Sequence, residues 1–329
     1  MRVGHNPARF VEKVARPAEI TVTVVNCIPF LSGYYEQSLE VLKAVVESLN
    51  ATREAAHPYD VMIFDNHSCK EVRAYLKDAS DQGRIQNLVL SDTNIGKIGA
   101  WNYLFGAAAG KYIVYSDGDV VFRSGWLSAS LELFETFPNV GMVTARPFRP
   151  SYRYSSATFD WASKQDPGVL EEGPFLDWET VWEHGRSLGA PEEESRSKFP
   201  RGKDRRLSFH GKIAFIGAGH FQFMTSRELL QKIIPFPSEQ PMRGERALDN
   251  AVNERGYLRL TTEKPLVLHM GNRLLESAHL AASSPRRKSL LRRLLWLPGI
   301  RHILLWFQVR IWDSDIFNTV VFNSCPVSQ

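Results

Sequence analysis

The feature that most constrains the fold is a regular alternation of two kinds of segment between residues 20 and 145. Short apolar runs rich in β-branched residues have the character of buried strands. The stretches between them place apolar residues at helical spacing. Strands are expected at 20–27, 59–65, 85–90, 111–116 and 140–145, and helices at 35–50, 72–79, 98–109 and 127–134. This alternation predicts an α/β fold, with a mainly parallel sheet flanked by helices.

A different composition follows in residues 147–212, which are rich in Pro, Gly, Trp and charge and show weak periodicity. A loop of this length inside a compact domain is usually functional. Regular patterns then resume, with strands expected at 212–216, 220–224, 258–262 and 266–270 and helices at 227–233 and 246–255. We therefore interpret 147–212 as an insertion within one folded domain.

Two carboxylates, Asp117 and Asp119, follow the strand expected at 111–116. Residues i and i+2 of an extended segment face the same side, and Gly118 between them allows the backbone to bend. Two close carboxylates are costly unless a cation neutralises them, and Mg²⁺ commonly uses one or two carboxylates together with substrate phosphate. The alternative is a surface turn, in which Asp-Gly is common.

Other polar residues also fall where predicted strands end, namely Asn26 and Asp65. In open α/β sheets, ligands bind beyond the carboxyl ends of the strands. The convergence of these positions with the acid pair favours a ligand site over isolated turns. For Asp65 alone, a turn aspartate remains the alternative.

Composition limits the kind of partner and compartment. A net charge of +4 over 329 residues gives no reason to expect nucleic-acid binding. Cys27, Cys69 and Cys325 are odd in number and lack metal-ligand spacing, which favours a reducing cytosol. Residues 1–17 have no apolar core of a secretory signal, and no apolar run is long enough for a transmembrane helix. We expect a cytoplasmic protein, with possible peripheral contact at the inner face of a membrane.

That membrane contact concerns the carboxyl-terminal stretch. Residues 286–329 mix basic residues with Leu, Ile, Trp and Phe, and 290–312 has the pattern of a basic amphipathic helix pair broken at Pro298-Gly299. Such segments can lie on anionic lipid surfaces. Docking onto the domain or onto a second copy in a homodimer is the other interpretation.

The order of these motifs resembles the GT-A-fold glycosyltransferases, most closely family 2. The resemblance rests on Val24-Val25-Asn26, Phe64-Asp65-Asn66-His67-Ser68, the segment from Asn94 to Asn102, Asp117-Gly118-Asp119, Gly217-Ala218-Gly219, Leu248-Asp249 and His269. It covers residues 20–272. Family members usually carry Glu-Asp where this chain has Leu248-Asp249, and often Arg where it has Trp101.

The resemblance implies roles for individual residues. The predicted nucleotide-sugar contacts are Asn26, Asp65, Asn66, Asn94, Gly96, Lys97, Asn102, Asp117 and Gly118. The predicted ligands of Mn²⁺ or Mg²⁺ are Asp117, Asp119 and His269, with Asp119 as the direct carboxylate ligand. Gly217 and Gly219 would contact the acceptor, and the tryptophans of the insertion, Trp178 and Trp182, suit sugar recognition or, alternatively, pack an extra subdomain. Asp249 is the predicted catalytic base; the alternative is a helical surface acid.

The implied activity is transfer of a sugar from a nucleoside-diphosphate sugar, with UDP favoured, to a hydroxyl of a glycan, a lipid-linked or a small-molecule acceptor. Transfer with inversion is expected. A retaining transferase and a non-catalytic nucleotide- or carbohydrate-binding protein are the alternatives. The predicted parts are an N-terminal extension (1–19), a nucleotide-sugar-binding half (20–146), an insertion or lid (147–212), an acceptor-side half (213–272) and a C-terminal extension (273–329).

Overall fold

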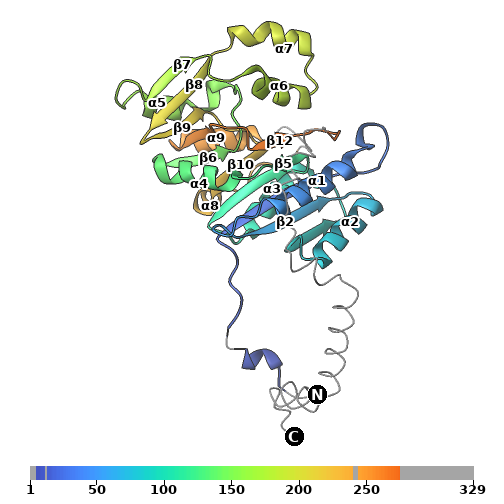
Figure 1. Ribbon diagram of the computed structural model, residues 1–329. Helices are drawn as coiled ribbons and strands as arrows, with labels where there is room; N and C mark the ends of the chain where they lie inside the picture. The colour runs from blue at the N-terminus through green and yellow to red at the C-terminus, as the bar shows by residue number, and fades with distance from the viewer. Residues whose placement is uncertain (1–4, 12, 240–243, 275–329) are drawn as a thin grey trace, which may run out of the picture. The chain divides into compact units, whose positions relative to one another are not determined.

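The structure is a computed structural model that describes residues 5–11, 13–239 and 244–274 (Figure 1). Its contacts divide the chain into residues 1–282 and 283–329, and the second unit lies wholly outside the described residues. The predictions for 286–329, membrane contact or dimerisation, therefore concern a part of the chain that the structure does not describe. No helix within the described ranges is long and apolar enough to cross a membrane.

The first half of the domain is a parallel sheet built as expected. Strand β1 is hydrogen-bonded in parallel to both β2 and β4, and β2 is parallel to β3. The strands are β1 (Ile20–Asn26), β2 (Tyr59–Asn66), β3 (Asn87–Ser91) and β4 (Tyr112–Asp117). The connecting helices are α1 (Ser38–Ala51), α2 (Lys70–Asp81) and α3 (Gly96–Ala107). Because each crossover carries a helix, all four strands run in one direction.

The second half extends the same sheet with strands of both directions. The ten strands follow the order β3-β2-β1-β4-β10-β6-β11-β9-β8-β7. Strand β10 is antiparallel to β4 and β6, β11 is parallel to β6, and β9 is antiparallel to β11. The bounds are β6 (Val140–Thr144), β9 (Lys212–Ile216), β10 (Gln222–Ser226), β11 (Leu258–Thr262), α4 (Trp126–Thr136), α8 (Arg227–Ile233) and α9 (Arg246–Glu254). The predicted α/β fold is confirmed.

Residues 147–212 contain more regular structure than their sequence suggests. Strands β7 and β8 continue the main sheet beyond β9, and α6 and α7 lie beside them at that end (Figure 1). The bounds are α5 (Ser156–Ala162), β7 (Leu170–Gly173), α6 (Trp178–Ser187), α7 (Glu192–Lys198) and β8 (Asp204–Phe209). A second, two-stranded sheet pairs β5 (Val120–Phe122) with β12 (Val267–His269).

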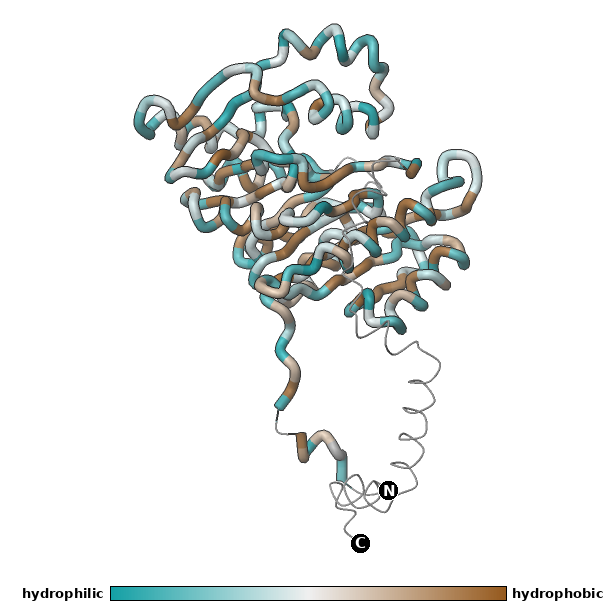
Figure 2. The backbone as a smooth tube through the Cα atoms, viewed as in Figure 1, coloured by the Kyte–Doolittle hydropathy of each residue, from teal (hydrophilic) through white to brown (hydrophobic). Residues whose placement is uncertain are grey.

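The core lies on both faces of the sheet. Val22 and Val24 of β1 pack in one cluster with α1, α2 and α4, whereas Val25 belongs to a second cluster with α3, α8 and α9. This split follows from the alternation of side chains along a strand. Hydrophobic positions accordingly follow the central strands (Figure 2). Two buried faces fix the sheet and hold the carboxyl ends of its strands in place.

Candidate active site

Three polar strand ends meet at one edge of the parallel sheet. The β1–β2 register places Asn26 opposite Asp65, and the β1–β4 register places Val25 opposite Asp117. Neighbouring parallel strands end at the same side, so residues far apart in the sequence come together here. The predicted convergence of Asn26, Asp65 and Asp117 is therefore present in the fold.

The segment after β4 brings a histidine to the acid pair. The chain turns at Gly118 and continues as β5, whose antiparallel pairing with β12 sets Val120 opposite His269. The amide of Met270 donates to the carbonyl of Asp119 at 2.9 Å. A Cβ on Gly118 would lie 3.1 Å from the Val25 carbonyl oxygen, which leaves little room for a side chain at this turn.

Three groups that can hold a metal ion lie close together at this turn. Ligand atoms of Asp117, Asp119 and His269 all lie within 4.8 Å of one another. The Oδ1 atom of Asp119 is buried without a hydrogen-bond partner among the described residues. Burial raises the pKa of Asp119 to about 6, although neighbouring His269 acts in the opposite direction. A buried carboxylate without a hydrogen-bond partner for one oxygen is costly, and a divalent cation bound by oxygen and imidazole donors would offset that cost.

Asp117 differs from Asp119 because it already has partners. The Lys97 ammonium lies 2.8 Å from Oδ1 and 2.9 Å from Oδ2 of Asp117, and the Tyr115 hydroxyl donates to Oδ1. Burial, followed by the charge of Asp117, raises the pKa of Tyr115 well above its usual value, so the hydroxyl keeps its proton. Lys97 also lies 3.9 Å from Glu245. This asymmetry favours Asp119 as the direct ligand of a cation.

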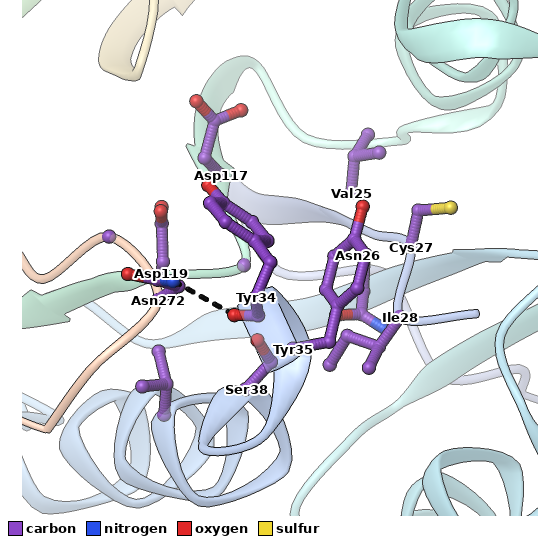
Figure 3. A pocket seen from close by; sticks show the side chains of 13 residues that line it. Val25, Asn26, Cys27, Ile28, Tyr34, Tyr35, Ser38, Asp117, Asp119 and Asn272 are labelled. Atoms are coloured by element: carbon purple, nitrogen blue, oxygen red, sulfur yellow. Dashed lines mark hydrogen bonds between the residues drawn. The ribbon is translucent and has the colours of Figure 1, made fainter. Parts of the chain in front are cut away.

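A cavity of about 230 Å³ opens beside the acid pair (Figure 3). Its lining includes Asp117, Asp119 and Asn26, together with Tyr34, Tyr35 and Asn272, which the sequence analysis did not single out. The Asn272 amide donates to the Tyr34 carbonyl at 2.8 Å and so joins the loop after β12 to the loop after β1. The two tyrosines belong to a Gly-Tyr-Tyr run that follows β1. Their position after a strand that ends at the predicted site is the sequence signal that indicates them.

The remaining strand-end residues are engaged with one another. Asp65 is fully buried, and its oxygens receive hydrogen bonds from Asn26, the Ser68 amide and Arg73. Asn66 donates to Asn94 at 2.9 Å, and Asn94 accepts from the amide of Gly96 at 2.9 Å. These contacts form a fixed rim beside the cavity. A direct contact of Asp65 or the asparagines with a nucleotide stays a prediction.

Two residues of the predicted Asn94–Asn102 segment are engaged in contacts within the fold. Asn102 uses its amide to donate to and accept from the backbone of Phe236, both at 2.8 Å. Trp101 is fully buried against Tyr115 and Phe223. The structure thus ties Asn102 to the loop after α8, and the residue that stands in place of the family's frequent Arg is a core side chain.

The predicted base, Asp249, lies in the first turn of α9 and is buried. Its Oδ1 atom pairs with Arg259, and its Oδ2 atom lies 3.8 Å from His220. The same guanidinium donates to the carbonyl of Ala218 at 2.8 Å, between the two predicted acceptor-side glycines. Asp249 and the 217–219 loop are therefore neighbours joined through Arg259, a residue that no motif had indicated.

The two tryptophans predicted for sugar recognition stack on each other. The ring centroids of Trp178 and Trp182 lie 5.5 Å apart at an angle of 7°, and Arg196 and Phe199 pack against Trp178. Neither tryptophan lines the cavity beside the acid pair. The contacts are those of residues that pack α6 against α7, so an acceptor role for them stays a prediction.

A family model described as glycosyl transferase family 2 matches residues 34–233, more than half of the chain. The chain belongs to this family. The predicted resemblance is thereby confirmed, and the matched residues include Asp117-Gly118-Asp119. Asp249 and His269 lie beyond the matched range, and their assignment depends on the fold and the motif order.

Solved structures similar to this family 2 chain have low sequence identity to it. Staphylococcus aureus TarS is 12% identical, with a TM-score of 0.43, over 76% of this chain and 36% of that one. GalNAc-T7 with UDP, GalNAc and Mn²⁺ is 13% identical, with a TM-score of 0.48, over 77% and 44%. The mannosyltransferase PcManGT from Pyrobaculum calidifontis, with GDP-Man and Mn²⁺, is 16% identical, with a TM-score of 0.41, over 78% and 60%.

The chain spans between about a third and three fifths of the length of these solved chains. No curated protein matches the family 2 chain in sequence.

Proposed function

We propose that this chain is a metal-dependent glycosyltransferase that moves a sugar from a nucleoside-diphosphate sugar to a hydroxyl group. The observation that carries the proposal is the group of Asp117, Asp119 and His269 at the carboxyl edge of the parallel sheet, beside a cavity. Family membership supports the reaction class. A UDP-sugar is the first donor to test, and the acceptor is a glycan, a lipid-linked or a small-molecule hydroxyl.

In this reaction the bond from the anomeric carbon to the phosphate oxygen breaks and a bond to the acceptor oxygen forms. Mn²⁺ or Mg²⁺ held by Asp119, Asp117 and His269 would neutralise the charge that grows on the departing diphosphate. Lys97 carries a second positive charge at the same edge, within reach of Asp117. Tyr34 and Tyr35 line the cavity and offer aromatic faces to the donor.

The acceptor hydroxyl must lose its proton as it attacks, and Asp249 is the base that we propose. Attack from the side opposite the leaving nucleotide gives inversion. Arg259 binds one oxygen of Asp249, which leaves Oδ2, on the side of His220, as the proton acceptor. Determining the anomeric configuration of the product tests inversion directly, because a retained configuration rules it out.

Binding of donor and metal can be measured by thermal shift of the full chain with nucleoside diphosphates and nucleotide sugars, with and without Mn²⁺. We expect one nucleotide class to raise the melting temperature more when Mn²⁺ is present. Asp119→Ala should lose this metal-dependent part. A chain that binds no nucleotide with or without metal would contradict the proposal, and donor binding without sugar transfer or donor hydrolysis would indicate a binding protein.

The base is tested with Asp249→Asn, compared with Glu245→Gln, which removes the other carboxylate at the start of α9. We expect Asp249→Asn to keep the metal-dependent thermal shift and to lose transfer by a factor of about a hundred or more. Transfer rates and thermal shifts are measured for both variants. An active Asp249→Asn protein removes the base assignment, and loss only in Glu245→Gln moves the role to Glu245.

A further inference from the structure

The carboxyl end of α6, within the insertion, contacts the predicted metal ligand His269. The Oγ atom of Ser187, the last residue of α6, lies 3.0 Å from Nδ1 of His269. The loop after β12 also packs against this helix end, since a Cβ on Gly271 would lie 2.8 Å from the Ser187 carbonyl oxygen. Neither family motifs nor the proposed reaction account for this contact.

The direction of the Ser187 hydrogen bond follows from counting hydrogens. The Ser187 hydroxyl has a single hydrogen, and it donates this to the carbonyl of His184 at 2.7 Å. Towards His269 the oxygen can therefore act only as an acceptor. Nδ1 of His269 must then carry a hydrogen, and in the neutral ring Nε2 is left with a free lone pair.

The free nitrogen faces the acid pair. Nε2 of His269 lies 3.5 Å from Oδ2 of Asp119. In the neutral ring this lone pair and the carboxylate oxygen repel each other, and a proton or a metal cation between them removes the repulsion. The same arrangement, in which the far nitrogen of a ligating histidine donates to a fixed oxygen, orients histidines at many metal centres.

We propose that Ser187 is a positioning residue that holds His269 in the tautomer with hydrogen on Nδ1 and so presents Nε2 to the metal ion. The insertion, rather than the central sheet alone, then completes the metal site. The inference rests on the proposed function where it concerns the metal, whereas the tautomer is a property of the metal-free chain.

Ion pairs and ring contacts hold α6 in place, so Ser187 can position His269. Glu183, one turn before Ser187, pairs with Arg146 at 2.6 Å and with Arg123 at 2.9 Å. The ring of His184 packs 5.0 Å from Phe221 and 6.1 Å from His269. These contacts tie α6 to β6, to the segment after β5 and to the metal-side histidine.

The tautomer can be read from ¹⁵N NMR of the metal-free full chain with labelled histidine at pH 8, above the ordinary pKa of histidine. His269→Gln identifies the signal. We expect wild-type His269 to show a protonated Nδ1 and an unprotonated Nε2, and Ser187→Ala to shift the population towards the other tautomer. Ser187→Thr, which keeps the hydroxyl, should restore the wild-type pattern. A wild-type His269 protonated on Nε2 would overturn the inference whatever the metal does.

Mn²⁺ binding, measured from the free-ion EPR signal, provides the second readout. Ser187→Ala should weaken Mn²⁺ binding by about tenfold to a hundredfold. Ser197→Ala is the matched control, because the Ser197 hydroxyl makes an equivalent bond to the Glu194 carbonyl on exposed α7. Unchanged affinity in Ser187→Ala, with a wild-type chain that does bind, refutes the role of Ser187 in metal binding. A wild-type chain that binds no Mn²⁺ refutes the metal part of the proposed function and leaves the tautomer to the NMR result.

Discussion

At the scale of single residues, the two acids of the Asp-Gly-Asp turn differ in their partners. Asp117 has Lys97 and Tyr115 as partners, whereas Asp119 keeps a buried oxygen without a hydrogen-bond partner among the described residues. The sequence indicated both acids as metal ligands, with Asp119 as the direct one, but it gave no sign of the partners of Asp117. Their difference depends on side chains from α3 and β4 that only the folded sheet brings into contact.

We predict that Asp119→Asn stabilises the metal-free protein at pH 8. The pKa of Asp119 in the folded chain is about 6, above its ordinary value of 3.8, so stability is lost as the pH rises from about 4 to about 6, and the full cost is present at pH 8. Removing the charge should raise the free energy of unfolding by up to about 3 kcal/mol at pH 8, and the gain should disappear near pH 4. Thermal unfolding across this pH range measures it.

Asp117→Asn is the control for that experiment. It removes a charge that Lys97 and Tyr115 already stabilise, so we expect this variant to lose stability at pH 8. A destabilised Asp119→Asn protein at pH 8 would show that Asp119 has a favourable partner in the metal-free chain.

The site could be predicted only in part from the sequence. Asp117, Asp119 and His269 were indicated by motif order, and the fold brings them within 4.8 Å of one another. The partner of Asp249 could not be predicted. Arg259 reaches Asp249 from β11 through a buried contact, and no sequence motif near either residue indicates this pair. For Asn102 the motif indicated a contact that the fold does not display. Its position predicts a ligand contact, but its side chain binds the backbone of Phe236.

At the scale of elements, the predicted strands and helices outside the insertion are confirmed. Some bounds move slightly, as for β10, which begins at Gln222 rather than at residue 220. Strand β5, which is three residues long and follows the Asp-Gly-Asp turn directly, was not predicted. The elements of 147–212 escaped because they are short and half-exposed, as in β7, so their alternation of burial is weak.

Two glycines, one inside α3 and one just after it, allow a test of how α3 packs against β1. The helix was expected to run to residue 109, yet α3 ends at Ala107, and Gly110 lies beyond it. A Cβ on Gly110 would lie 2.7 Å from the backbone nitrogen of Thr21, so the residue allows close contact with β1. We predict that Gly110→Ala lowers the free energy of unfolding by about 2 kcal/mol, since backbone atoms must move. Denaturant unfolding measures the change.

Gly106→Ala is the matched comparison. Gly106 lies inside α3, and a Cβ there would have no neighbour within 4 Å. Alanine is the better helix former, so this variant should gain about 0.5–1 kcal/mol. Equal effects of the two substitutions would mean that contact with β1 does not decide the role of Gly110.

At the scale of the whole molecule, a buried ion-pair network joins the insertion to the sheet. Arg146, two residues after β6, is fully buried and pairs with Glu183 of α6, and Arg123 after β5 pairs with the same carboxylate. Burial raises the pKa of Glu183, but the two guanidinium groups outweigh it and hold the pKa below its ordinary value of 4.5. A lid formed by 147–212 stays a prediction, and α6 is the part of it that this network fixes.

We predict that Glu183→Gln destabilises the chain and weakens its metal site together. Breaking the pair leaves Arg146 buried without a counter-charge, which should cost about 3 kcal/mol at pH 7. Because the Glu183 pKa is depressed, the pair stabilises the fold above about pH 4.5, and the difference in stability between the variant and wild type should shrink as the pH falls below that value.

If α6 positions His269 through Ser187, Mn²⁺ binding by Glu183→Gln should weaken along with its unfolding stability. Glu179→Gln, an exposed change on the same helix, should alter neither quantity. A Glu183→Gln chain with lower stability but wild-type Mn²⁺ affinity would mean that the sheet alone positions the metal ligands, independently of the insertion.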